Sequence, residues 1–135
     1  FRSRTGVSAV MSHRFTAAPA GTDLADARRL FEGAPEWLIV TESGRAAAVV
    51  TAEPIERALA ERGPDAVHAS AALTVEHGQG CVSVPASATL REALDAMDRA
   101  EVDVAVITGP SIRDANTIKG VLTRAEIEAA VRYHG

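Results

Sequence analysis

The segment Gly120-Val121-Leu122-Thr123-Arg124-Ala125-Glu126 places a hydroxyl and a carboxylate three residues apart, where a predicted strand runs into a predicted helix. A helix N-terminus offers unpaired backbone N–H groups and a partial positive charge, which suit a phosphate. A carboxylate in the first turn can accept hydrogen bonds from a vicinal diol. The same Thr-x-x-Glu spacing is also that of a capping box, which needs no ligand, so both interpretations stay open.

A second threonine, Thr51, has the same place in the first half of the chain but lacks the partners of Thr123. Ala48 stands where the second segment has glycine, and Pro54 stands where it has Glu126. Proline has no side chain that could bind a sugar, and it is common in the first turn of a helix. Thr51 is therefore expected to be mainly an N-cap, and the first site to be degenerate.

Arg124 at the start of the last predicted helix has two interpretations: contact with a phosphate, or a solvated surface charge. The four histidines share no metal-ligand spacing, and His77 with Cys81 gives too few ligands for zinc. The sequence contains no nucleophile–base pair, no phosphate loop and no carboxylate pair in a predicted cleft. We expect no catalytic site and no metal site, so the protein is not expected to be an enzyme.

The elements that position these residues occur twice. Pro19 to Ala27 realigns on Pro85 to Ala93, and the same offset places Leu38–Val40 on Val104–Val106. After an insertion of six residues, Val49–Ile55 falls on Val121–Ile127. A duplicated unit of this size buries its apolar face poorly alone, so two copies should pack on each other and leave a cleft between them.

Each repeat is predicted to run strand, helix, strand, strand, helix. Leu24, Ala27, Leu30 and Phe31 form one apolar stripe after a cap at Thr22 or Asp23, and Thr89 with Glu92 forms a capping box before the second copy. A hairpin is expected over residues 37–50, with Gly44 in its turn. The closing helices are expected at about Ala52–Arg62 and Arg124–His134, with a linker between the repeats.

The composition favours a globular domain in a reducing compartment. The 135 residues are 47% hydrophobic and carry a formal net charge of −4, so nucleic acid is not an expected partner. Cys81 is the sole cysteine and is expected to be a small buried hydrophobe. The apolar runs are too short for a membrane span. Because the chain opens on Phe1 rather than methionine, we expect a fragment of a longer protein.

These features resemble the tandem CBS-domain pair, also called a Bateman module. The resemblance runs from about Val7 to Tyr133, opens with the lead-in Val7–Met11, and is most specific at Gly120–Glu126, which is close to the family's Gly-x-x-Thr-x-x-Asp signature. It implies an α/β fold of two repeats packed sheet to sheet, with repeat 1 at residues 7–62, a linker at 63–79 and repeat 2 at 80–134.

The resemblance also implies a site for an adenine nucleotide in the cleft between the repeats. The threonine of the signature touches the ribose-phosphate region, and its aspartate, here Glu126, accepts the ribose hydroxyls. Strand residues would line the adenine pocket, although they are equally strand core. Trp37 either stacks on adenine or closes the strand edge or the dimer surface. The residues implied are Thr123, Glu126, Gly120, Arg124, Val104, Ala105, Ser83, Thr16 and Thr51.

The implied function is that of a cytoplasmic regulatory module. No cofactor is required, and AMP, ADP or ATP would be regulatory ligands of a disc-like homodimer attached to an effector domain. The ending from Ile118 to Tyr133 resembles the tail of a chloride channel of the CLC type. Two alternatives remain: a ligand-free dimerisation or interaction module, and the regulatory domain of a soluble enzyme similar to IMP dehydrogenase.

Overall fold

The structure, a computed structural model, describes residues 5–62, 71–109, 111, 113 and 117–134. The chain forms two compact units. We call residues 14–79 the first-repeat unit, and residues 1–13 together with 80–135 the second-repeat unit.

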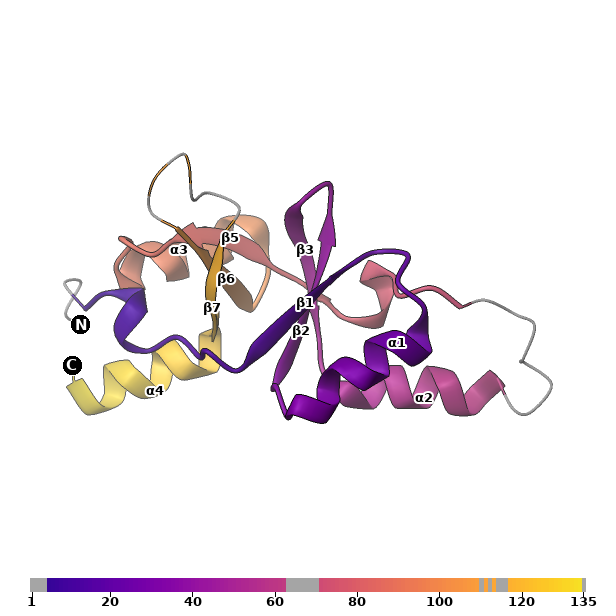
Figure 1. Cartoon of the computed structure of the whole chain (residues 1–135). Helices are drawn as coiled ribbons and strands as arrows, with labels where there is room; N and C mark the ends of the chain where they lie inside the picture. The colour runs from indigo at the N-terminus through magenta and orange to yellow at the C-terminus, as the bar shows by residue number, and fades with distance from the viewer. Residues whose placement is uncertain (1–4, 63–70, 110, 112, 114–116, 135) are drawn as a thin grey trace. The chain divides into compact units, whose positions relative to one another are not determined.

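The first-repeat unit is a sheet with two α-helices (Figure 1). Its strands lie in the order β1-β2-β3-β4, with β1 parallel to β2 and β2 antiparallel to β3. The elements are β1 (Phe15–Pro19), α1 (Leu24–Arg29), the 3-10 turn η2 (Leu30–Gly33), β2 (Trp37–Glu42), β3 (Arg45–Val50), α2 (Ala52–Arg62), η4 (Val75–His77) and β4 (Gln79–Gly80).

The second-repeat unit repeats the strand-helix-strand-strand-helix order around a three-stranded sheet (Figure 1). Strand β5 is parallel to β6, and β6 is antiparallel to β7. Its elements are η1 (Val7–Ala9), β5 (Val82–Pro85), α3 (Leu90–Ala100), β6 (Val104–Thr108), β7 (Ile118–Thr123) and α4 (Arg124–His134). The predicted α/β fold with its duplicated strand-helix-strand-strand-helix unit is confirmed.

Local sequence signals explain where the helices and the hairpin form. The Asp23 carboxylate accepts a hydrogen bond from the Ala25 N–H at 2.8 Å and caps α1. Thr89 and Glu92 form the predicted capping box of α3, with bonds of 3.1 and 3.0 Å. Ser43 and Gly44, with φ of 52° and 77°, make the two-residue turn between β2 and β3, which matches the twist of the strands.

The apolar stripe expected on the first helix is only partly right. Leu24 and Ala27 are buried, but Leu30 is 37% exposed. The α-helix ends at Arg29 and continues as the 3-10 turn η2, which advances about 120° per residue instead of about 100°. Leu30 lies about 120° round the helix from Leu24, at the edge of the stripe, and begins the turn that ends the α-helix, so it is left partly exposed.

The predicted register between the second strands of the repeats is wrong by one residue. Thr16 pairs with Leu38, and Val82, the counterpart of Thr16 in the second repeat, pairs with Ala105. Leu38 therefore corresponds to Ala105, not to Val104, and both lie in the core beside the helices. The extra residue falls before β6, where α3 runs for 11 residues while α1 has 6 and ends in a 3-10 turn.

The domain boundaries differ from those expected because each lead-in packs against the other repeat. Val7 donates to the Ala88 carbonyl at 3.0 Å in the second-repeat unit, and Leu73 donates to the Thr22 carbonyl at 2.6 Å in the first-repeat unit. The two bonds join equivalent positions of the duplication. Val7 and Leu73 are both fully buried. Residues 7–13 therefore belong with repeat 2, and residues 71–79 of the predicted linker complete repeat 1, whereas residues 63–70 lie outside the described residues.

Candidate functional site

Thr123 and Glu126 are joined by three hydrogen bonds at the junction of β7 and α4. The Thr123 backbone N–H and hydroxyl donate to Glu126 Oε1 at 3.0 and 2.9 Å, and the Glu126 N–H donates to Thr123 Oγ1 at 3.1 Å. The capping-box interpretation is thus confirmed. Both side chains are half-buried, and within the described part of the chain Glu126 Oε2 accepts no hydrogen bond.

Gly120 lies where the lead-in crosses β7. A Cβ on this residue would lie 2.7 and 2.8 Å from Sδ and Cγ of Met11, and 2.9 Å from the Ser12 carbonyl oxygen. In the first-repeat unit the glycine lies on the lead-in instead of on the strand: it is Gly78, the counterpart of Ser12. A Cβ on Gly78 would clash with the Val49 carbonyl. Ala48 is therefore tolerated where the second repeat needs glycine. The glycine serves close packing in this structure, a requirement that does not by itself mark a ligand site.

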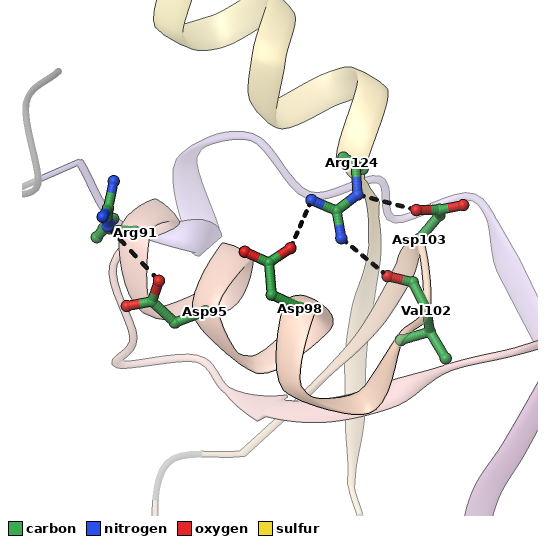
Figure 2. A network of polar contacts seen from close by, with 6 residues as sticks. All are labelled: Arg91, Asp95, Asp98, Val102, Asp103 and Arg124. Carbon is green, nitrogen blue, oxygen red and sulfur yellow. Dashed lines mark hydrogen bonds and ion pairs between the residues drawn. The ribbon is translucent and has the colours of Figure 1, made fainter.

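Arg124 is engaged in an ion-pair network that neither sequence interpretation anticipated (Figure 2). Its guanidinium donates to the Asp98 and Asp103 carboxylates at 2.9 Å each and to the Val102 carbonyl at 3.2 Å. The bonds to Asp103 and then Asp98 raise the pKa of Arg124. The arginine thereby ties the first turn of α4 to the end of α3 and the segment before β6.

Removing this network should lower stability in a salt-dependent way. Arg124 is 29% exposed and has two carboxylate partners, whereas Arg29 is 70% exposed and, among the described residues, pairs with Asp26 alone. We expect Arg124→Met to lower the melting temperature more than Arg29→Met, because water screens the less exposed ion pairs of Arg124 more weakly. The difference should shrink in about 1 M sodium chloride, where charges are screened within about 3 Å. Equal melting temperatures for the two variants would contradict this role.

The strand residues predicted to line a pocket do not share one face of the sheet. Val104 pairs with Thr123 at the site end of β6. Ala105 is fully buried in the core between the sheet and α3 and α4, so its side chain points away from the face on which Val104 lies. Ser83 is exposed on β5 and pairs with Val106. The second-repeat unit thus brings Thr123, Glu126, Arg124 and Val104 to one strand end, with Gly120 on the same strand.

Thr16 and Thr51 belong to the first-repeat unit. Thr16 is half-buried on β1 opposite Leu38. Thr51 is exposed just before α2, and no hydrogen bond of its hydroxyl is found among the described residues. Its expected role as a side-chain N-cap is therefore wrong, because Pro54 has no N–H at the position where Glu126 supplies one to Thr123.

This contrast between the repeats predicts different costs for the same substitution. Thr123→Ala removes a hydroxyl with two hydrogen bonds and should lower the free energy of unfolding by about 1 kcal/mol. Thr51→Ala removes a hydroxyl that makes no hydrogen bond to the described part of the chain and should leave stability unchanged within error. Chemical denaturation of the two variants measures both values, and equal losses would refute the difference between the caps.

Two further side chains have unusual surroundings. Trp37 is 8% exposed, and in the described part of the structure its buried Nε1 has no hydrogen-bond partner. Stacking on adenine, closing the strand edge and closing the dimer surface all remain hypotheses for this ring. Cys81 is half-buried rather than fully buried as expected, and this partial burial raises the pKa of its thiol to about 11, which favours the protonated form at neutral pH.

The described residues contain neither a metal-binding group nor a membrane span. No cluster of three or more His, Cys, Asp or Glu side chains within them could hold a metal ion. None of their helices is long and apolar enough to cross a membrane. A cavity of about 320 Å³ lies between α1 and α2 and is lined by Arg28, Glu56, Leu59 and Ala60, none of them among the predicted site residues.

Comparison with known proteins identifies the fold. The family model of the CBS domain matches residues 79–133. No curated protein gives a significant match. Among solved structures, the CBS domain pair of protein MJ0100, in complex with 5′-methylthioadenosine and S-adenosyl-L-methionine, has a TM-score of 0.61 at 13% identity and covers 97% of this chain and 98% of its own.

Two other similar structures come from bacteria. A hemolysin-like protein containing a CBS domain, from Oenococcus oeni PSU, has a TM-score of 0.64 at 16% identity, with 94% of this chain and 90% of that chain covered. The CBS domain of a bacterial CNNM/CorC family Mg²⁺ transporter in complex with ATP has a TM-score of 0.63 at 18% identity and covers 96% and 89%. The chain has the fold of a tandem CBS-domain pair, and its second repeat also matches the CBS family model.

Proposed function

We propose that this chain is a regulatory module, not an enzyme, that binds an adenosine-containing ligand at the second repeat and passes the change to an attached effector. The observation that carries the proposal is the position of Thr123 and Glu126 at the β7–α4 junction, in the repeat that matches the CBS model. Glu126 Oε2 has no bond within the described chain and remains able to accept a ribose hydroxyl.

Similar structures support the ligand class and the kind of parent protein. One such CBS pair was solved with S-adenosyl-L-methionine and 5′-methylthioadenosine, and another, from a Mg²⁺ transporter, with ATP. A third is the cytosolic domain of the Mg²⁺ channel MgtE in complex with ATP. We therefore propose a membrane transport protein as the parent and the cytoplasm as the location of the module. A chloride channel of the CLC type is the narrower form of this proposal.

Ligand-induced stabilisation tests the proposal. A ligand at a hundredfold excess over its dissociation constant adds about 2.7 kcal/mol to the free energy of unfolding. We expect AMP, ADP, ATP or S-adenosylmethionine to raise the melting temperature of the chain, and Glu126→Ala to abolish the shift. Unchanged melting across millimolar concentrations of all four compounds would reject a sensor for these ligands.

The alternative is a ligand-free dimerisation module, and one observation favours it. Thr123 and Glu126 satisfy each other, and Arg124 is neutralised by two carboxylates, so neither motif nor arginine requires a ligand. Under this alternative the thermal shift is absent, whereas dimerisation remains.

We also propose that the module forms a homodimer through its helices. The α1 and α2 side of the first-repeat unit exposes Leu30 and has a cavity lined partly by Leu59, and apolar groups at the surface favour association. The cavity also carries Arg28 and Glu56, which a twofold axis could pair between copies. Sedimentation should show a dimer at micromolar concentrations, and a monomeric mass at high micromolar concentration would disprove it.

A further inference from the structure

The segment of residues 5–12, which we call the N-terminal strap, is bound along the second-repeat unit at both of its ends. Near its start, Leu90 donates to the Thr5 carbonyl at 2.8 Å. At its end, Ser12 and Val121 exchange two backbone hydrogen bonds of 2.8 and 3.0 Å. Between these points the Ser8 hydroxyl donates to the Ala86 carbonyl at 3.0 Å. The strap is therefore an integral part of this folded unit.

Apolar side chains fix the strap between its polar contacts. Val7 is fully buried in the core that includes Leu90, Met97 and Ile127, and Val10 and Met11 pack against the same core. Met11 fills the space that the missing side chain of Gly120 leaves open. Removing the strap should therefore lower the free energy of unfolding far more than removing a segment without buried contacts.

The strap ends next to the candidate ligand site. Val121, which pairs with Ser12, lies two residues before Thr123 on β7, and Thr123 holds Glu126. The chain then leaves the unit between His13 and Arg14. Any displacement of the strap is thus applied to the strand that positions the Thr123–Glu126 pair.

We propose that docking of the N-terminal strap and ordering of the Thr123–Glu126 pair are coupled, so that the strap carries the regulatory signal into or out of the second repeat. The part of this proposal that concerns a ligand rests on the proposed function. Coupling of two sites is reciprocal, so a ligand that orders the pair must also tighten the strap. A segment attached ahead of residue 5 would then act on repeat 2 although it precedes repeat 1 in the sequence.

The first-repeat unit offers a matched control. Residues 71–78 form the equivalent segment there: Leu73 is buried like Val7, and the Leu24 N–H donates to the Ala71 carbonyl at 2.9 Å, as Leu90 does to Thr5. Leu73→Ala should therefore loosen a strap of the same kind without touching β7 or α4.

Amide hydrogen exchange of the ligand-free chain tests the coupling. Val7→Ala should raise the exchange rates of residues 7–12 and of residues 123–126 together by at least about tenfold, with a smaller rise in the middle of α3. Ser8→Ala, which removes one hydrogen bond at an exposed residue, should produce a weaker rise at the same two places and keeps the test valid if Val7→Ala does not fold. Leu73→Ala should leave residues 123–126 unchanged.

Two results would overturn the coupling. The first is a strap that loosens while residues 123–126 exchange no faster than the middle of α3. The second is binding of S-adenosylmethionine or AMP, shown by calorimetry, with no slowing of exchange in residues 7–12. If neither compound binds, the proposed function fails for them, and the variant data alone decide whether the strap and the motif are coupled.

Discussion

Gly120→Ala should lower the free energy of unfolding by about 1–3 kcal/mol, the usual cost of inserting a methyl group into a well-packed region. The added Cβ would lie within 3 Å of Met11 Sδ and Cγ and of the Ser12 carbonyl oxygen. The Met11 side chain can move, but the Ser12 backbone is held in place. Its carbonyl accepts a hydrogen bond from the Val121 N–H, and its N–H donates to the Val121 carbonyl. Part of the clash therefore remains after side chains adjust.

Gly33→Ala is the matched control for this prediction. A Cβ on Gly33 meets nothing within 4 Å, and the residue has no positive φ, so the substitution should be neutral or slightly stabilising. Met11→Ala in the Gly120→Ala background should recover part of the loss, since it removes two of the three clashing atoms. Denaturant unfolding that gives Gly120→Ala the stability of the unmodified chain would show that the strap does not pack as closely as described.

Glu126→Gln should weaken binding of an adenosine-containing ligand by about 1.5–3 kcal/mol, the range for a hydrogen bond to a charged group. The melting temperature of the free protein should barely change. Thr123 donates twice to a single oxygen, Oε1, and the glutamine amide keeps a carbonyl oxygen that can accept both bonds. The substitution therefore separates ligand binding from capping.

Glu128→Gln serves as the control for Glu126→Gln. Glu128 is exposed two residues later on α4, so this variant removes the same charge without touching the motif. Calorimetry should give Glu128→Gln nearly the affinity of the unmodified chain. Equal affinity of all three proteins would mean that the Glu126 carboxylate does not contact the ligand.

The duplicated fold was predictable because its signals are local. The caps at Asp23, Thr89 and Thr123 each depend on residues two or three positions away, and the hairpin turn depends on Ser43 and Gly44. Patterns of this length specify helix starts and turns regardless of the rest of the chain. Both closing helices accordingly begin at the residue expected, Ala52 and Arg124.

Features that depend on distant residues were not predictable. Asp98 and Asp103 lie far before Arg124 in the sequence, and only the packing of α4 beside the end of α3 brings them together. The exchange of the lead-ins was missed for the same reason, since Val7 precedes repeat 1 but bonds Ala88 of repeat 2. One signal was present: the offset from Val7 to Leu73 equals that of the recognised repeat, so the duplication extends into both lead-ins.

The prediction that the first site is degenerate was based on Ala48 and Pro54, and the structure adds a second effect of the proline. Pro54 removes both the carboxylate and the N–H that complete the motif in the second repeat, which leaves Thr51 exposed at the start of α2. Ala48 in place of a glycine is not a sign of degeneracy, because in the first-repeat unit Gly78 is the residue that allows the two chain segments to pack closely.

Isothermal titration of the chain with AMP, ADP, ATP and S-adenosylmethionine tests the central claim most directly. The Thr123–Glu126 pair exists in one repeat only, so we predict that at least one of these compounds binds with a stoichiometry of one per chain. No binding heat with any of the four, or two equivalent sites per chain, would contradict a single adenosine-ligand site at the second repeat.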